Sequence, residues 1–225
     1  MACALSLIKR AAVSLFHPWL WRIRPLRRSA LCANPFLQFE KWFRAANRCF
    51  WLVFPEAMHL ATIDEQGFPD GRFVLLKSFD ERGFVFYTNS NSAKGRALKL
   101  RPHGALTFYW EALQRQVRVQ GVVSPVSAEE ADAYFASRPR ASQIGAWASQ
   151  QSEPLESRAV LERCTAEFKT KFAGRKIPRP PHWSGYRLRP EKFEFWQIRP
   201  NRLHDRFCYT KNQSDDGWKI VRLNP

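Results

Sequence analysis

The stretch Trp196–Phe207 holds the densest group of side chains that could carry chemistry. Arginines, a histidine and an aspartate lie among apolar residues in the sequence WQIRPNRLHDRF. Cations at this density either stay in solvent or bind an anion. Because Trp196, Leu203 and Phe207 recur between them, we interpret the stretch as a strand-loop-strand element whose polar side chains converge on a ligand. An exposed basic hairpin is the alternative that this stretch alone leaves open.

Side chains, rather than a backbone loop, would have to bind that anion. The sequence contains no Gly-rich nucleotide loop, no GxSxG turn, and no HExxH or paired histidine and cysteine metal site. Arginine binds phosphate through a two-pronged guanidinium group, and lysine binds it as a point charge. The candidates are the basic residues Arg72, Lys77, Lys94, Arg138, Arg202 and Arg206 and the hydroxyl groups of Thr88, Tyr134 and Ser142.

The charge balance also indicates an anionic partner. Lysine and arginine number 36 against 20 aspartates and glutamates among 225 residues, which gives a net charge of +16. This sign fits phosphate-bearing small molecules, nucleic acid or a membrane surface, and it does not choose among them. With 45% hydrophobic and 14% aromatic residues, the chain has ample apolar material for a buried core.

Residues 1–34 differ from the rest because they contain basic residues and no acidic one. Charged residues and proline interrupt their apolar pieces, so no run of about 20 apolar residues is present to span a membrane. We interpret 1–34 as a basic extension that is disordered, a surface-binding arm or an organelle-targeting leader. Five scattered cysteines without a CxxC pair argue against a disulfide framework or a zinc site and fit a reducing, cytoplasmic compartment.

Residues 35–225 are expected to form one domain of strands and helices. Asn34 followed by Pro35 is typical of a helix start, and apolar residues at helical spacing follow as far as Phe50. A meander of about seven or eight strands that closes into a barrel, with helices outside, is the simplest architecture. The predicted strands are 59–63, 72–77, 84–88, 105–110, 116–123, 186–188, 193–197, 207–210 and 218–223, and the further helices are 93–100, 127–137, 141–149 and 156–172.

Five segments in a fixed order resemble the pyridoxine/pyridoxamine 5′-phosphate oxidase family. They are RFVLLK (72–77), FYTN (86–89), RQVRVQG (115–121), YFASRPRASQIGAWAS with QS (134–149 and 151–152) and FWQIRPNRLHDRF (195–207). The C-terminal WKIVRLNP is similar as well. Together they make a specific match that extends over residues 35–225.

The resemblance implies a mainly β fold with flanking helices (α+β), a split β-barrel that binds FMN at the interface of a homodimer. Family positions that contact FMN correspond to Arg72, Phe73, Val74, Leu75, Leu76, Lys77, Tyr87, Thr88, Lys94, Gln116, Gln151, Ser152, Trp196 and Arg206. Positions that hold substrate or product correspond to Lys77, Tyr134, Arg138, Ser142, Arg202, Leu203 and His204, of which Arg202 and His204 are the catalytic candidates.

The activity that the resemblance implies is oxidation of pyridoxamine 5′-phosphate and pyridoxine 5′-phosphate to pyridoxal 5′-phosphate, in the synthesis and salvage of vitamin B6. FMN takes a hydride from the C4′ carbon, and dioxygen reoxidises the flavin with release of hydrogen peroxide. Lys77, Tyr134, Arg138 and Ser142 would hold the substrate phosphate. Arg202 and His204 would cover the pyridine ring opposite the flavin.

Two departures from the family pattern matter. The family commonly has arginine before the lysine of an SRKG turn, whereas this chain has Ala93 before Lys94, so one cation expected at the FMN phosphate is absent. Arg96, one turn further along, is the candidate to replace it. The family's arginine-tyrosine segment that folds over the substrate has no clear equivalent, and only Arg27 and Arg28 are weakly similar to it.

Two other functions remain open from the sequence. A non-catalytic flavin-binding or pyridoxal-phosphate-binding split-barrel protein would keep Arg72 and Trp196 but lack turnover. A basic β-barrel that binds nucleic acid would use the same positive charge, with stacking aromatic side chains among the basic residues of one sheet face. We expect neither nucleic acid nor a membrane span.

Overall fold

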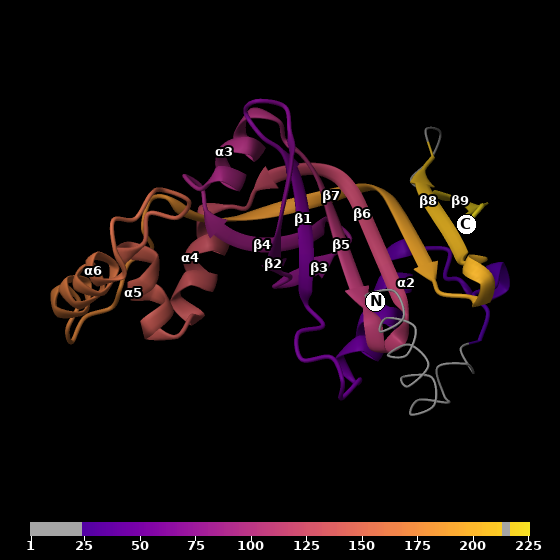
Figure 1. Cartoon of the computed structure of the whole chain (residues 1–225), viewed down its shortest axis with the longest axis horizontal. Coiled ribbons are helices and arrows are strands. Elements are labelled where there is room, and N and C mark those ends of the chain that lie inside the picture. Colours follow the sequence, from indigo (N-terminus) through magenta and orange to yellow (C-terminus); the bar gives the residue numbers. More distant parts are fainter. Residues whose placement is uncertain (1–23, 213–216) are drawn as a thin grey trace, which may run out of the picture. The chain divides into compact units, whose positions relative to one another are not determined.

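A computed structural model describes residues 24–212 and 217–225 and divides into two compact units (Figure 1). The terminal unit comprises the described residues up to Pro55 together with Phe108–Val117 and Phe193–Pro225. The central unit comprises Glu56–Thr107 and Arg118–Lys192. Three strands pass from one unit into the other along the chain, so each unit is built from segments that are far apart in sequence.

The described residues form a nine-stranded sheet, and the pairs β1·β2, β1·β5, β3·β4, β4·β7 and β8·β9 are antiparallel. The order of strands is β2-β1-β5-β6-β7-β4-β3, and β8 pairs with both β7 and β9. The strands are β1 (Ala57–Ile63), β2 (Pro69–Leu75), β3 (Ser78–Asp80), β4 (Gly83–Asn89), β5 (His103–Trp110), β6 (Arg115–Pro125), β7 (Trp183–Gln197), β8 (Asp205–Lys211) and β9 (Trp218–Leu223).

Four helices belong to the central unit, and a serine side chain caps the start of three of them, α3, α4 and α6. The side chain of Ser92 accepts a hydrogen bond from the backbone N–H of Gly95, and Ser127 accepts one from Glu130, so each satisfies an unpaired donor of a first turn. The helices are α3 (Ala93–Leu100), α4 (Ala128–Ser137), α5 (Arg140–Ala148) and α6 (Arg158–Lys171).

The terminal unit is organised around helix α2 (Pro35–Asn47), whose apolar stripe packs on aromatic residues of the sheet. Asn34 caps the helix by accepting from the N–H of Phe36. Buried Phe39 and Trp42 lie on one face, and the Trp42 ring meets Phe195 edge to face at 5.3 Å. Short 3₁₀ turns occur at Arg28–Ala30, Glu111–Leu113 and Pro200–Arg202.

Much of the predicted local structure is confirmed. The helix start at Asn34 and Pro35, the helix 93–100 and the final strand 218–223 are found at the predicted residues. The predicted strand 116–123 lies within β6, where half-buried and buried residues alternate from Gln116 and Val117 onward. None of the helices in the described ranges is long and apolar enough to cross a membrane.

Several predictions were wrong where long-range pairing decides the structure. Residues 186–188 and 193–197 belong to one long strand, β7, rather than two. The run 72–77 ends as a strand at Leu75, and the separate strand β3 pairs with β4. The strand order is not a sequential meander, because β1 pairs with β5 and β4 pairs with β7. Phe50 lies beyond the end of α2 and is 88% exposed.

Ordered structure begins before Asn34, where the sequence pattern predicted it to start. The side chain of Leu26 is buried, and its backbone N–H donates to the carboxylate of Asp205 at 3.0 Å. The carbonyl of Cys32 accepts from the hydroxyl of Tyr209 at 2.9 Å. Residues 24–34 of the predicted extension are therefore packed against β8, whereas residues 1–23 lie outside the described residues.

Candidate functional site

Lys94 lies at the first turn of α3 and is the most buried cation of the central unit. Only 9% of the residue is exposed. Its Nζ donates to Ser92 Oγ at 3.1 Å, Thr88 Oγ1 at 3.3 Å and Gln151 Oε1 at 3.0 Å. These oxygens are all neutral, and no carboxylate in the described ranges forms an ion pair with the ammonium group. The charge of Lys94 is therefore buried without compensation.

The electrostatics of Lys94 reflect this arrangement. Burial lowers its pKa from 10.5 to about 8, and the nearby positive charge of Arg72 acts in the same direction, with Asp70 opposing. An anion placed at this group would reverse the penalty. The position of Lys94 at the N-terminus of α3 also favours a bound anion, because unpaired backbone N–H groups at a helix N-terminus attract negative charge.

Arg72 on β2 is held in place by the neighbouring strand and turn. One guanidinium nitrogen donates to Thr62 Oγ1 at 2.7 Å and to the carbonyl of Leu60 at 3.3 Å, and the other pairs with Asp70. The side chain is 19% exposed. Arg72 thus adds positive charge beside Lys94 while being oriented by its own partners.

Arg138 is a half-buried cation of the same unit. It follows the last residue of α4, and its guanidinium carbon lies 4.7 Å from the ring centroid of Trp183 and 5.6 Å from that of Phe135. Its NH1 is buried and has no hydrogen-bond partner within the described part of the chain. Burial lowers the pKa of the group. An unpaired N–H of a buried cation costs free energy unless an acceptor binds there.

Aromatic rings form a stack beside Arg138. The rings of Tyr87 and Tyr134 are 3.9 Å apart at 15°, and the Tyr87 and Trp183 rings are 5.3 Å apart at 9°. Gly185 makes room for this stack, because a Cβ there would meet the Tyr87 ring at 2.6 Å. Burial raises the pKa of Tyr87 to about 12, so its hydroxyl stays protonated at neutral pH.

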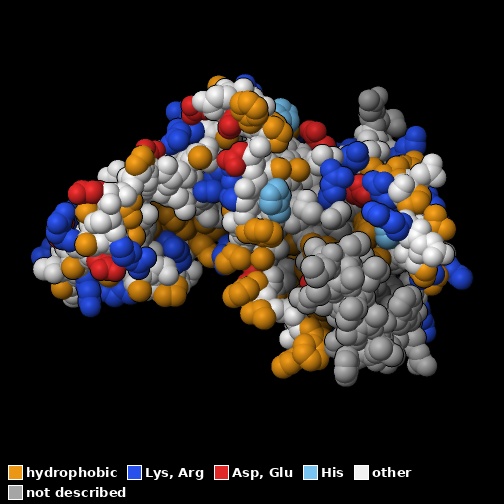
Figure 2. Space-filling view, in the orientation of Figure 1, with side chains coloured by type: hydrophobic (Ala, Val, Ile, Leu, Met, Phe, Trp, Pro, Cys, Tyr) orange, Lys and Arg blue, Asp and Glu red, His pale blue; other side chains and the backbone are white. Residues whose placement is uncertain are grey.

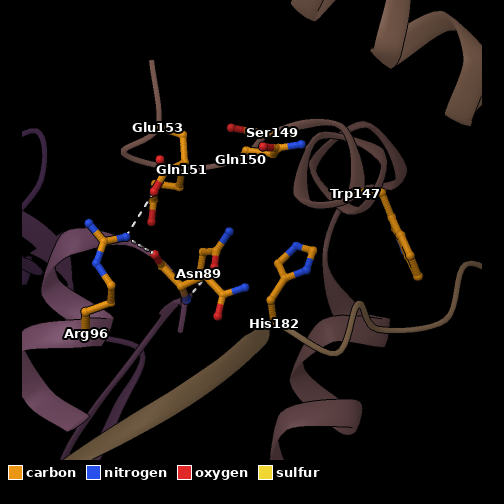
Figure 3. A pocket seen from close by; sticks show the side chains of 9 residues that line it. Asn89, Arg96, Trp147, Ser149, Gln150, Gln151, Glu153 and His182 are labelled. Carbon is orange, nitrogen blue, oxygen red and sulfur yellow. Dashed lines mark hydrogen bonds and ion pairs between the residues drawn. The ribbon is translucent and has the colours of Figure 1, made fainter. Parts of the chain in front are cut away.

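A hollow of about 480 Å³ lies next to the Lys94 cluster, and its lining is polar (Figure 3). Arg96 faces Glu153 across it, with a 3.0 Å ion pair, and also pairs with Glu65 at 3.4 Å. The charge of Arg96 is therefore already balanced, so the structure does not support Arg96 as a replacement for the cation missing at Ala93. The other lining residues are Asn89, Asn91, Trp147, Ser149, Gln150, Gln151 and His182.

In the terminal unit, the stretch 196–207 is a strand, a short turn and a strand, as predicted. The imidazole of His204 lies 4.6 Å from the Trp196 ring, and its Nδ1 accepts from the backbone N–H of Arg199 at 3.1 Å. Burial lowers the pKa of His204, and the positive charges of Arg202 and Arg206 lower it further. The imidazole is therefore neutral at pH 7 with its proton on Nε2.

The turn between β7 and β8 carries backbone strain at a candidate residue. Asn201 and Arg202 both have positive φ, 56° and 63°. Positive φ disfavours residues with a Cβ, and such strain often accompanies a binding site. Arg202 and Leu203 are exposed, the latter by 65%.

Asp205 pairs with two arginines, one in this turn and one in β9, and neither is among the two assigned to ligands. It is 5% exposed, and its carboxylate lies 3.6 Å from Nε of Arg199 and also pairs with Arg222. Arg206 has a different partner, because its Nε donates to buried Glu194 at 2.8 Å. An acid in this anion-binding stretch therefore has a structural explanation.

The structure groups the predicted site residues into two sets, one in each unit. Thr88, Lys94 and Gln151 are joined by hydrogen bonds, and Ser152, with a φ of 74°, follows directly. The remaining central residues are exposed Phe73, Leu75, Lys77 and Ser152, half-buried Val74 and Ser142, and buried Leu76. The terminal set comprises Gln116, Trp196, Arg202, Leu203, His204 and Arg206.

Two models of known families match the chain. The model described as pyridoxamine 5′-phosphate oxidase covers residues 49–172, and the model described as the pyridoxine 5′-phosphate oxidase C-terminal dimerisation region covers residues 183–225. Proteins named pyridoxine/pyridoxamine 5′-phosphate oxidase from Gloeothece citriformis and Rubrobacter xylanophilus are 56% and 57% identical over 192 residues. These alignments cover 85% of this chain and 89% and 87% of the two relatives.

The chain belongs to the pyridoxamine 5′-phosphate oxidase family.

Solved structures of the family share the fold. PhzG from Burkholderia lata 383, in complex with tetrahydrophenazine-1-carboxylic acid, superposes with a TM-score of 0.82 at 31% identity, covering 90% of this chain and 99% of that one. An FMN-binding protein from Nostoc punctiforme related to pyridoxamine 5′-phosphate oxidase gives a TM-score of 0.68 at 19% identity, covering 87% and 100%. The predicted mainly β split barrel with flanking helices is therefore confirmed, and this chain is an enzyme of the oxidase family.

Sequence reasoning missed several residues that contact the candidate site residues. Ser92 caps α3 and also binds Lys94, Trp183 lies under Arg138, and buried Glu194 holds Arg206. The capping pattern before Ala93 was visible in the sequence, so the contact of Ser92 could have been proposed. The roles of Trp183 and Glu194 had no local signal, because their partners lie 45 and 12 residues away.

Proposed function

We propose that this protein oxidises pyridoxamine 5′-phosphate and pyridoxine 5′-phosphate to pyridoxal 5′-phosphate, with FMN as cofactor and dioxygen reduced to hydrogen peroxide. One observation carries the proposal beyond family membership. The central unit holds two cations, buried Lys94 and half-buried Arg138, that have no carboxylate partner among the described residues. The reaction brings together two phosphate monoesters, that of FMN and that of the substrate.

The residues around Lys94 fit the phosphate of FMN. The ammonium group lies at a helix N-terminus among neutral hydroxyl and amide oxygens, and burial, together with the charge of Arg72, lowers its pKa. Arg72 adds charge from β2, in a geometry set by Asp70 and Thr62. We assign the flavin contacts as the sequence predicted them: Arg72, Phe73, Val74, Leu75, Leu76, Lys77, Tyr87, Thr88, Lys94, Gln116, Gln151, Ser152, Trp196 and Arg206.

The residues around Arg138 fit the phosphate of the substrate. NH1 of Arg138 has no acceptor of its own, and a phosphate oxygen would supply one. The hydroxyl groups of Tyr134 and Ser142 and the ammonium group of Lys77 complete the set that we assign to this phosphate. Its charge-assisted hydrogen bonds would hold the substrate by an end remote from the reacting carbon.

FMN, when bound, accepts the hydride that leaves the C4′ carbon of the substrate. The protein orients the substrate and holds His204 in a defined protonation state. Neutral His204 presents an Nε2–H donor, because Nδ1 accepts from the N–H of Arg199. The strained turn presents the guanidinium group of Arg202. We assign Arg202, Leu203 and His204 to the face of the pyridine ring, where orientation lowers the barrier.

The C-terminal match to a dimerisation region supports a homodimer. We further propose that FMN binds at the subunit interface. The charge pattern favours a small-molecule partner over nucleic acid. Figure 2 shows basic side chains interspersed with acidic ones over the helices α4–α6, without the continuous basic stripe that a nucleic-acid surface would present on this face.

Flavin spectroscopy with a peroxide assay tests the proposal. The purified protein, or the protein reconstituted with FMN, should show flavin absorbance that bleaches under anaerobic pyridoxamine 5′-phosphate. Air should restore the colour with one hydrogen peroxide released per pyridoxal 5′-phosphate formed. A protein that takes up FMN but is not bleached would be a carrier, and one that takes up no FMN would rule out both the oxidase and the carrier.

A further inference from the structure

We propose that Trp183 is a positioning residue. Its ring holds the guanidinium group of Arg138 in place and leaves the N–H donors of that group available to the substrate phosphate. The inference rests on the proposed function, because it takes Arg138 as the phosphate ligand. Trp183 is not among the residues assigned to the substrate. Trp183 is the first residue of β7 and is 6% exposed. Most of its surface is therefore covered by the protein and is not available to a ligand.

Trp183 is fixed by the fold on several sides. Its backbone N–H donates to the carbonyl of Pro180 at 3.0 Å, and its own carbonyl accepts from Arg179 at 2.7 Å. Its ring stacks on Tyr87 and meets Phe135 edge to face at 5.1 Å. Rings packed in this way lose rotamer freedom, so the tryptophan is a rigid platform.

The guanidinium group of Arg138 lies over this platform, 4.7 Å from the ring centroid. Aromatic faces attract cations through the ring quadrupole, and tryptophan does so most strongly. This attraction uses no N–H donor. A carboxylate in the same place would take two donors and cancel the charge, as Glu130 does for Arg187 with contacts of 2.9 and 3.0 Å.

The two arginines therefore represent two ways of holding a cation in one unit. Arg187 forms ion pairs with Asp80 and Glu130, and we interpret it as a structural residue. Arg138 is held by rings and keeps a buried, unpaired NH1. Tyr134 lies on the same stack, with its ring 8° from parallel to that of Trp183. The stack thus sets the relative positions of two groups assigned to one phosphate.

The test compares Trp183→Leu and Trp183→Phe in the FMN-loaded enzyme. The readout is the ratio of kcat/KM for pyridoxamine 5′-phosphate to kcat/KM for unphosphorylated pyridoxamine. Losing the aromatic face should lower this ratio roughly three- to thirtyfold in Trp183→Leu, through KM, and less in Trp183→Phe. Phe172→Leu, in the same core cluster but away from Arg138, should change both substrates equally.

A double variant separates positioning from packing. If Trp183 acts through Arg138, adding Trp183→Leu to Arg138→Met should cause no further fall in the ratio. An unchanged ratio in Trp183→Leu, or a full further fall in the double variant, would overturn the inference. If Trp183→Leu does not fold, the intermediate ratio expected of Trp183→Phe decides by itself.

Binding of pyridoxal 5′-phosphate to the FMN-loaded protein distinguishes this inference from the proposed reaction. Its Kd should rise in Trp183→Leu and stay near the wild-type value in Phe172→Leu. If wild-type protein binds this aldehyde, and Trp183→Leu weakens binding, while no substrate gives peroxide, the reaction is wrong and the positioning role stands. If peroxide forms normally and both Kd and the substrate ratio are unchanged, only the positioning role is wrong.

Discussion

At the scale of single residues, Lys94 shows how a binding group can be recognised by what it lacks. Three neutral oxygens surround its ammonium group, although a buried cation is stable in a protein mainly when an anion accompanies it. Arg138 lacks an acceptor for NH1 in the same unit. A buried cation without an anion, or a buried N–H without an acceptor, costs free energy, so we propose that both groups bind ligands with negative charge.

Replacing Lys94 with methionine should weaken FMN binding by roughly 10- to 150-fold, the loss expected for a charge-assisted hydrogen bond. Quenching of FMN fluorescence on titration measures the Kd. Lys99→Met is the matched control, because Lys99 is exposed on the same helix and should leave the Kd unchanged. Equal Kd values in wild type and Lys94→Met would remove Lys94 from the cofactor site.

The affinity for FMN should also depend on pH through Lys94. In the free protein its pKa is lowered to about 8, so the ammonium group is charged below that pH and becomes neutral above it. A phosphate bound beside it favours the charged form, and the phosphate itself becomes a monoanion below about pH 6. Binding should therefore be tightest between about pH 6 and 8 and weaken above. In Lys94→Met the weakening above pH 8 should disappear; its persistence would assign it to another group.

Arg202→Leu should lower turnover far more than FMN affinity, because we place Arg202 over the substrate ring and not at the flavin phosphate. Anaerobic stopped-flow reduction by pyridoxamine 5′-phosphate measures the chemical step, and FMN titration measures the cofactor. Arg158→Leu, on the exposed face of α6, is the control and should change neither. A wild-type reduction rate in Arg202→Leu would refute the assignment.

At the scale of elements, the turn between β7 and β8 is built around the buried carboxylate of Asp205. It accepts from the backbone of Leu26, which is 179 residues away in sequence, and pairs with Arg199 and Arg222. These contacts tie the strand that follows the turn to the chain segment before α2. The exposed residues Arg202 and Leu203 can therefore project from a turn whose base is fixed.

Asp205→Asn should destabilise the protein by about 1–3 kcal/mol, because it leaves Arg199 without its counter-charge and weakens a buried hydrogen bond. Urea unfolding followed by tryptophan fluorescence gives the free energy. Asp132→Asn provides the comparison, since its carboxylate pairs with Arg179 at a surface position that is 60% exposed and should matter little. A similar loss in both variants would mean that Asp205 is not a structural centre.

At the scale of the whole molecule, a single chain leaves a run of apolar side chains in water. Phe50, Trp51, Val53 and Phe54 are 88%, 64%, 79% and 65% exposed. Such a group usually marks an interaction surface. The family match to a dimerisation region in residues 183–225 makes a second copy of this chain the expected partner.

Sedimentation velocity should therefore show a dimer, and the double variant Trp51→Ser with Phe54→Ser should shift the population toward monomer, because aromatic burial contributes strongly to interfaces. Leu155→Ser, also exposed but outside this run, should leave the dimer intact. A monomeric wild type at every concentration would contradict the proposed homodimer. A dimer unaffected by the double variant would place these side chains outside the interface.

The sequence by itself determined the features that depend on near neighbours. Asn34, Ser92 and Ser127 cap their helices because the donors that they satisfy lie two or three residues further along the chain. The family segments, and with them the candidate residues, were also readable, because motifs are local. The strand-loop-strand around residues 196–207 was predicted for the same reason.

Only the tertiary structure decided which charges are compensated. Arg96 is paired with Glu153, 57 residues away, whereas Lys94, two residues earlier in the same helix, meets only neutral oxygens. Trp183 contacts Arg138 because β7 pairs with β4 beside helix α4. No sequence pattern near residue 183 predicts this contact. Burial and pairing depend on contacts between distant segments, so the charge state of a site cannot be read from spacing along the chain.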